Sequence, residues 1–249
     1  MRIADAEGKN AFAKFAASKG EAYRAIDQIA LSPDGRTVAG ACRDGMCRLW
    51  NVETGALVDT FGKLATDIRC VAFSPDGQYI ATGDVARIIR IRHLASGRDV
   101  ARLRGHGGIV RGLAFSPKGD RLHSVAEDGR LGVWHTNFDA YSRFEVRYPD
   151  DGIYGVRFDP AGRNITACTY GGDVIEIDAA TGREKRRLDA HGKRSCHVLS
   201  FDAKHARMLT GSWDRTMKVW DTRTHELIAS HTFEGGVFCG DISPDGRRV

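Results

Sequence analysis

The sequence predicts an all-β chain made of repeated four-stranded antiparallel units, and three regularities point to it. A Ser-Pro-Asp-Gly turn or a close variant recurs, an apolar anchor residue precedes each turn, and a Trp or its substitute lies nineteen residues after each anchor. Between these markers apolar and polar residues alternate and no period of 3.6 is sustained, which indicates strands rather than helices.

The turns set the length of each unit. Pro presets φ, Asp can bond its own backbone and Gly takes the left-handed conformation, so each such turn predicts a tight reversal between two strands. The anchors are separated by 42, 42, 43, 43 and 41 residues, and they are Leu31, Phe73, Phe115, Phe158, Phe201 and Ile242. We therefore expect strand A to end at the anchor and strand B to follow the turn.

Two further turns complete each unit. Asp44-Gly45 and Asp128-Gly129 are hairpin dipeptides that predict a reversal between strands B and C. Strand C ends at the Trp position, and a turn centred five residues later leads into strand D; this turn holds Gly55, Gly97, Asp139, Gly182 and His225 in successive repeats.

A unit of about 42 residues cannot bury both faces of its sheet alone, so radial packing against neighbours predicts a β-propeller. We expect about six blades, with the terminal blade split between the two chain ends or the ring incomplete. The expected segments are 1–24 (end of a preceding blade plus linker), the blades 25–62, 63–105, 106–147, 148–190 and 191–235, and a partial blade at 236–249.

The two ends of the chain are expected to be incomplete. Residues 2–5 resemble the end of a strand C and Ala11 to Phe15 a strand D, although Ala and Lys also favour an amphipathic helix over 11–25. The C-terminal residues supply a strand A and the start of a B. Either the two ends close one blade as a clasp, which would remove sheet edges, or the chain is an internal piece of a longer protein, the alternative we favour.

Composition excludes several classes of protein. Of 249 residues, 42% are apolar and 28% charged, which is unlike a disordered or collagen-like chain. No apolar run approaches the roughly eighteen residues that span a bilayer, and no signal-peptide block is present, so we expect a cytoplasmic chain without a membrane span. The six cysteines form no C-x-x-C pair, which favours buried free thiols over a metal site.

Several dipeptides resemble those of the Trp-Asp (WD) repeat family of β-propellers. They are Gly105-His106 and Trp220-Asp221, with Ala190-His191, Trp50-Asn51 and Trp134-His135 as looser versions. The resemblance covers nearly the whole chain and implies a non-enzymatic scaffold, because members of this family mostly have no catalysis in common.

The resemblance also implies a structural tetrad of His, Ser or Thr, Asp and Trp in each blade. Carried over by position, the sets are His106, Ser124, Asp128 and Trp134, then His191, Thr210, Asp214 and Trp220, with Asp44 and Trp50 retained in the first repeat. That repeat has Gly40 at the hydroxyl position. The repeats ending at Arg92 and Ile177 lack both Trp and the aligned Asp, so we expect less rigid blades there.

No motif of catalysis or cofactor binding fits the sequence. P-loop, zinc-protease, nucleophile-elbow, dinucleotide and EF-hand patterns are missing, so we expect no enzyme, no cofactor and no metal. One alternative is a propeller enzyme or ligand-binding ring with Asp27, Glu127 and His197 facing the channel. Another is nucleic-acid binding through basic outer strands at 87–104 and 183–194, which would be strongly salt-dependent.

The remaining candidate is a protein-binding face at the channel mouth. Two positions in each blade, four residues before the anchor and just before the B–C turn, hold large side chains of types enriched at interaction hot spots. The predicted partner-binding residues are Arg43, Arg69, Arg111, Glu127, Tyr154, Tyr170, His197 and Trp213. This set predicts a protein or peptide partner, bound by a monomeric propeller or by part of a larger chain, and its arginines suit an acidic or phosphorylated partner. Alternatively, the tyrosines fill gaps in a degenerate repeat and Trp213 caps its neighbour.

Overall fold

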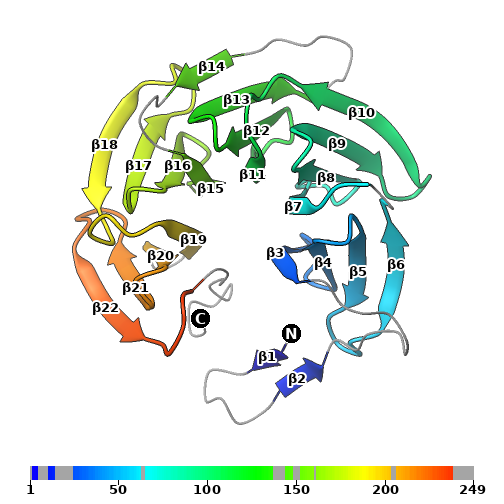
Figure 1. Ribbon diagram of the computed structural model, residues 1–249, viewed down its shortest axis with the longest axis horizontal. Helices are drawn as coiled ribbons and strands as arrows, with labels where there is room; N and C mark the ends of the chain where they lie inside the picture. Colours follow the sequence, from blue (N-terminus) through cyan, green and yellow to red (C-terminus); the bar gives the residue numbers. More distant parts are fainter. Residues whose placement is uncertain are drawn as a thin grey trace. The chain divides into compact units, whose positions relative to one another are not determined.

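The computed structural model describes residues 2–4, 11–14, 25–62, 65–136, 144–147, 152–159, 161–202 and 206–237. The regular secondary structure of these residues is entirely β (Figure 1). In this part of the chain there are five four-stranded sheets and one two-stranded sheet, and every strand pairing among them is antiparallel. The chain divides into two compact units, residues 1–105 and 106–249.

The first unit contains the two-stranded sheet and two four-stranded blades. Strands β1 (Arg2–Ala4) and β2 (Ala11–Lys14) pair with each other. The first blade is β3 (Ile26–Leu31), β4 (Thr37–Cys42), β5 (Cys47–Asn51) and β6 (Leu57–Phe61). The second is β7 (Ile68–Phe73), β8 (Tyr79–Asp84), β9 (Ile88–His93) and β10 (Arg98–Arg104). A buried cluster including Leu49, Val71 and Ile80 packs the two blades together.

The second unit contains three blades. They are β11 (Val110–Phe115), β12 (Arg121–Ala126), β13 (Arg130–His135) and β14 (Phe144–Arg147); β15 (Ile153–Phe158), β16 (Asn164–Thr169), β17 (Asp173–Asp178) and β18 (Glu184–Asp189); and β19 (Cys196–Asp202), β20 (Arg207–Ser212), β21 (Thr216–Asp221) and β22 (Leu227–Thr232). Their first strands β11, β15 and β19 are neighbours, and the later strands of each blade lie progressively outward (Figure 1). Alternating strand residues bury one core between each pair of adjacent blades.

The predicted turns explain where the strands reverse. Gly35, Gly77, Gly119 and Gly162 have φ of 70°, 69°, 73° and 67°, which is the left-handed conformation that favours glycine. In the first of these turns the Gly35 N–H donates to the Ser32 carbonyl at 2.9 Å. Pro160 lies outside the described residues, but its turn closes in the same way, from the Gly162 N–H to the Asp159 carbonyl.

The all-β class and the four-stranded blades are confirmed, but the count of about six blades is not: the described residues form five four-stranded blades. That count included a partial blade at 236–249, and residues 238–249, with Phe238, fall outside the described part, as does Asp139. The pairing of β1 with β2 agrees with strands C and D, so the helix alternative is wrong over Ala11–Lys14. Within the described residues no helix is long and apolar enough to cross a membrane.

Candidate functional site

Two sets of tetrad residues come together in the second unit. In the blade β11–β14, the Trp134 Nε1 donates to the Ser124 Oγ at 2.8 Å, and that hydroxyl lies 2.7 Å from the His106 Nε2. The other imidazole nitrogen of His106 is 3.3 Å from both carboxylate oxygens of Asp128. The four side chains therefore form one continuous hydrogen-bonded chain.

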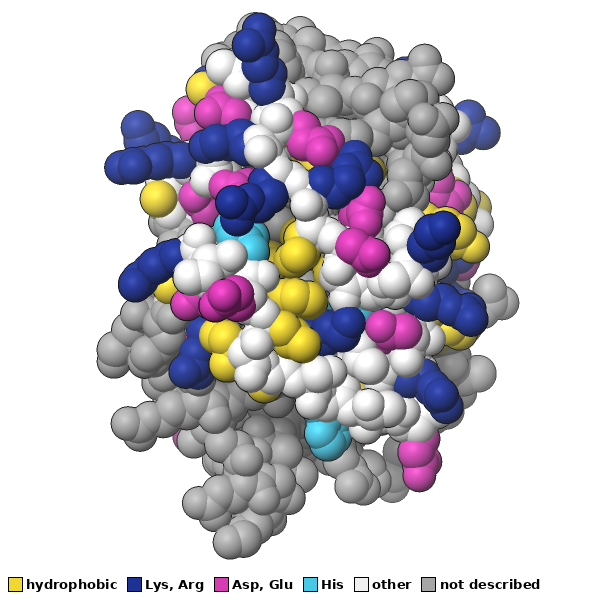
Figure 2. All heavy atoms as spheres, turned by 90° about the vertical axis from the view of Figure 1, so that its left-hand side faces the viewer, with side chains coloured by type: hydrophobic (Ala, Val, Ile, Leu, Met, Phe, Trp, Pro, Cys, Tyr) yellow, Lys and Arg dark blue, Asp and Glu magenta, His cyan; other side chains and the backbone are white. Residues whose placement is uncertain are grey.

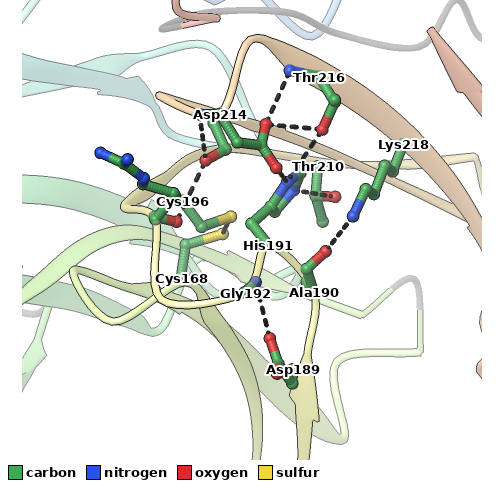
Figure 3. Close-up of polar contacts among 12 residues, drawn as sticks. Cys168, Asp189, Ala190, His191, Gly192, Cys196, Thr210, Asp214, Thr216 and Lys218 are labelled. Atoms are coloured by element: carbon green, nitrogen blue, oxygen red, sulfur yellow. Dashed lines mark hydrogen bonds and ion pairs between the residues drawn. The ribbon is translucent and has the colours of Figure 1, made fainter. Parts of the chain in front are cut away.

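The second set has the same arrangement with a shorter contact between the His and the Asp (Figure 3 shows His191, Thr210 and Asp214). The Thr210 Oγ1 is 2.8 Å from both the Trp220 Nε1 and the His191 Nε2, and the His191 Nδ1 is 2.8 Å from the Asp214 Oδ2. The Asp214 carboxylate can only accept, so the proton of the neutral imidazole lies on Nδ1, and the bare Nε2 accepts from the Thr210 hydroxyl, which itself accepts from the Trp220 indole. Burial lowers the pKa of His191, so this neutral tautomer is the form that the chain of bonds requires.

The first blade keeps the aspartate and the Trp, but its aspartate pairs with an arginine instead of a histidine. Arg48 on β5 forms two hydrogen bonds with Asp44, at 3.0 and 2.7 Å, and its side chain is almost completely buried. A Cβ added to Gly40 would lie 2.7 Å from the Trp50 Cζ3. The indole therefore occupies the space that a hydroxyl side chain would need, which explains the glycine at this position.

The second blade, which lacks the aligned Asp, holds a different buried carboxylate. Asp84 at the end of β8 is 1% exposed and accepts a hydrogen bond from the Ile88 N–H at 2.9 Å. Arg90 on β9 pairs with its other oxygen. No marker of the repeat indicates this pair, because Asp84 lies two residues before the position where the repeat predicts an aspartate.

The predicted rim residues of the first unit form a salt-bridge network. Asp27 on β3 accepts from the Arg43 Nε at 2.8 Å and from the Arg69 Nη1 at 2.6 Å, which joins the two blades. Arg69 also contacts Asp67 at 3.1 Å. Both arginines are thus already neutralised by carboxylates of the same unit.

The predicted rim residues of the second unit form an aromatic cluster, which we call the aromatic rim cluster: Arg111, Glu127, Tyr154, Tyr170 and His197. The Arg111 guanidinium lies over the Tyr154 ring, 5.2 Å from its centroid, and is paired with Glu127. The Tyr154 centroid is 4.9 Å from that of His197 and 5.9 Å from that of Tyr170. Arg111, Tyr154 and His197 thus occupy equivalent positions on β11, β15 and β19. Arg111 contacts Tyr154, and Tyr154 contacts His197.

Exposure and charge differ across this surface. Tyr170 is 62% exposed and Trp213, after β20, is 56% exposed, so two large aromatic surfaces face solvent. His197 is half-buried; burial and then the nearby Arg111 charge lower its pKa to about 4, so its ring is neutral at pH 7. The Ser195 Oγ lies 2.9 Å from the His197 Nε2, and the Ser195 carbonyl accepts from the Trp213 N–H.

The candidates for the two alternative functions are placed as follows. Asp27 and Glu127 are salt-bridged to arginines, and His197 packs on Tyr154. The described residues contain no group of three or more His, Cys, Asp or Glu that could hold a metal ion. The basic segments include the outer strands β10 and β18, whose side chains are mostly exposed, and Arg187 on β18 is paired with Asp173 and Glu184.

A pocket of about 220 Å³ that the sequence analysis missed opens between the blades β15–β18 and β19–β22. Figure 2 shows this side of the molecule, where apolar side chains are visible among charged ones. Val174, Leu188, Phe201 and Met208 supply the apolar part of its lining. His225 reaches the pocket from the turn before β22.

His225 adopts φ of 63° in a turn whose equivalents have Gly55, Gly97 and Gly182 at 70°, 65° and 71°. Its Nδ1 accepts from the Arg186 Nη1 at 2.5 Å, and its Nε2 lies 3.6 Å from a Glu176 carboxylate oxygen. The His225 ring therefore connects the turn before β22 to strands β17 and β18 of the preceding blade. In the sequence, the only sign of this contact is that His225 stands at a turn position where three other repeats have Gly.

Comparison with known proteins places these features in a family. The family model described as WD domain, G-beta repeat, matches residues 55–92, 97–135 and 182–221, and that of the Anaphase-promoting complex subunit 4 WD40 domain matches residues 6–73. Topless-related protein 1 of Arabidopsis thaliana is 26% identical over 121 residues, which are 47% of this chain and 11% of that protein.

Two further relatives give the same result. Jouberin of Rattus norvegicus is 29% identical over 46% of this chain and 12% of its own length. The probable coatomer subunit beta' of Schizosaccharomyces pombe is 31% identical over 43% of this chain and 13% of its own length. The chain therefore spans only about a tenth of each of these relatives. Because the family models together match more than half of the chain, it belongs to the WD-repeat family of β-propeller proteins.

Proposed function

We propose that this chain is a non-enzymatic scaffold that binds a protein or peptide partner through the aromatic rim cluster together with Trp213. The observation that carries the proposal is the exposure of Tyr170 and Trp213, each more than half exposed, beside tightly packed Arg111, Tyr154 and His197. Rigid aromatic side chains lose little conformational entropy on binding, and Tyr, Trp and Arg are enriched at binding hot spots.

The family and the named relatives support a role in assemblies. The matching WD40 domain model and one relative are described as belonging to subunits of multi-protein assemblies, the anaphase-promoting complex and the coatomer. Relatives roughly ten times longer than the matched segment also support a chain that acts as one part of a larger protein.

The rim arginines that would attract an acidic or phosphorylated partner are already paired with carboxylates. Arg43 and Arg69 share Asp27, and Arg111 is paired with Glu127. An anionic partner would have to displace these internal carboxylates, so the net attraction would be smaller than three free arginines would provide. A partner that packs on the exposed aromatic side chains does not have to displace an internal carboxylate.

The test is affinity capture followed by mass spectrometry, comparing the wild-type chain with a Tyr170→Ala/Trp213→Ala variant. Leu227→Ala/Ile228→Ala is the matched control, because these apolar residues on the outer strand β22 are 49% and 50% exposed. We expect the rim variant to lose partners that the control retains. Equal recovery by both folded variants would contradict the proposed surface, and phosphatase treatment of the lysate tests separately whether phosphate is required.

A further inference from the structure

Two buried cysteines of neighbouring blades meet inside the second unit (Figure 3). Cys168 lies on β16 and Cys196 begins β19, and their Sγ atoms are 2.8 Å apart. Both residues are fully buried. The sulfur–sulfur bond of a disulfide is about 2.05 Å long, so an approach of less than about 1 Å would bring these atoms to bonding distance.

The surroundings keep the two sulfur atoms together. Cys168 and Cys196 belong to the apolar cluster between the two blades, with Val174, Leu199 and Met208. Burial raises the pKa of the Cys196 thiol well above its ordinary value, so this group stays protonated at neutral pH. Reaction with a solution oxidant therefore requires the blades to separate transiently, and a bond formed there would be shielded from reductants.

We propose that Cys168 and Cys196 are a modification site, an oxidisable dithiol that forms a disulfide between β16 and β19. The oxidant class is a low-molecular-weight disulfide such as oxidised glutathione. One cysteine, as its thiolate, attacks a glutathione sulfur and releases one glutathione thiolate; the second cysteine then attacks the mixed disulfide and releases the other. Two protein thiols thus become one disulfide, while one glutathione disulfide becomes two glutathione molecules that take up the two protons.

The position of this pair gives the bond a consequence for the surface. Tyr170 follows Cys168 by two residues and His197 directly follows Cys196, and both belong to the aromatic rim cluster. A disulfide would fix the spacing of these two rim residues from beneath. This consequence rests on the proposed function, whereas formation of the disulfide does not.

The experiment treats the full chain with oxidised glutathione, then unfolds and alkylates it and maps the peptides by mass spectrometry. We expect two of the six cysteines to escape alkylation and a linked peptide that contains Cys168 and Cys196. A disulfide between residues 28 positions apart would close a loop and restrict the unfolded chain, which stabilises the fold. We therefore expect Tm to rise on the order of 5–10 °C and to return to its original value on reduction.

Cys168→Ala and Cys196→Ala should abolish the rise in Tm, whereas Cys70→Ala, which alters an equally buried cysteine on β7, should preserve it. Alkylation of all six cysteines in the treated wild type, or a linkage between other cysteines, would overturn the proposal. The mapping uses wild-type protein and decides the matter even where a variant does not fold. If the disulfide is mapped but the rim variants still capture the same partners as wild type, the proposed function is contradicted and the disulfide proposal is not.

Discussion

Removing one hydroxyl from the second tetrad should cost the fold several kilocalories per mole. In Thr210→Val the shape of the side chain is kept while the atom that both accepts from Trp220 and donates to His191 is lost. Thr210 is fully buried, so no water replaces it. Each buried polar group left without its partner costs about 1–3 kcal/mol, and two such groups predict a loss of about 3 kcal/mol.

The repeat itself provides a matched control. Thr82 on β8 lies ten residues before Arg92, as Thr210 lies ten before Trp220, and it is 5% exposed. Its blade has no tetrad, and the described residues form no hydrogen bond to its hydroxyl, so Thr82→Val should change stability by less than about 1 kcal/mol. Urea unfolding followed by circular dichroism measures both variants. Equal losses for the two substitutions would refute the view that the tetrad's hydrogen bonds stabilise the blade.

Three further predictions concern buried or strained side chains. His123 on β12 is fully buried, and its ring nitrogens have no hydrogen-bond partner in the described part of the chain. Burial lowers the pKa of His123 to about 3. Acid therefore protonates this residue in the unfolded state first, and the stability of the fold falls as the pH drops below 6.5. His123→Leu should therefore lose about 3 kcal/mol less stability than wild type between pH 7 and pH 4 in urea unfolding, and an equal loss in both proteins would contradict this assignment. At His225, whose φ is positive, the Gly variant should be about 1 kcal/mol more stable than the Ala variant by thermal melting, and the reverse order would disprove strain there. Asp84→Ala should cost about 3 kcal/mol in urea unfolding because Arg90 is left without its carboxylate, and a loss below about 1 kcal/mol would contradict this pairing.

The fold was predictable because its signals are local and repeated. A turn that needs Gly at positive φ, an apolar anchor before it and a Trp at a fixed offset each restrict the backbone within a few residues, and their agreement defines the strands. The sequence could not set the number of blades in the same way, since that depended on residues after Ile242. The Ser124 and Thr210 contacts were implied by the resemblance to the WD-repeat family, and the constant ten-residue spacing to Trp supported that assignment.

The contacts that the analysis missed join elements that are distant in sequence or depart from the repeat. Cys168 and Cys196 are 28 residues apart and occupy different positions in their repeats, so no pattern relates them. The pairing of Asp27 with Arg69 could have been found, because these residues stand at the same position of consecutive repeats and carry opposite charges. A side-by-side comparison of charge at equivalent positions predicts which rim arginines are already neutralised.

The tetrads also order the loops that carry the rim. Asp128 and Asp214 each accept a backbone N–H of their own turn, from Arg130 at 3.1 Å and from Thr216 at 2.7 Å, and each directly follows a rim residue. Trp213 therefore stands on a turn whose backbone is already held by hydrogen bonds. If Trp213 binds a partner as we propose, its contacts carry a smaller entropic cost of association, and the buried histidines and tryptophans of these blades contribute to affinity without touching the partner.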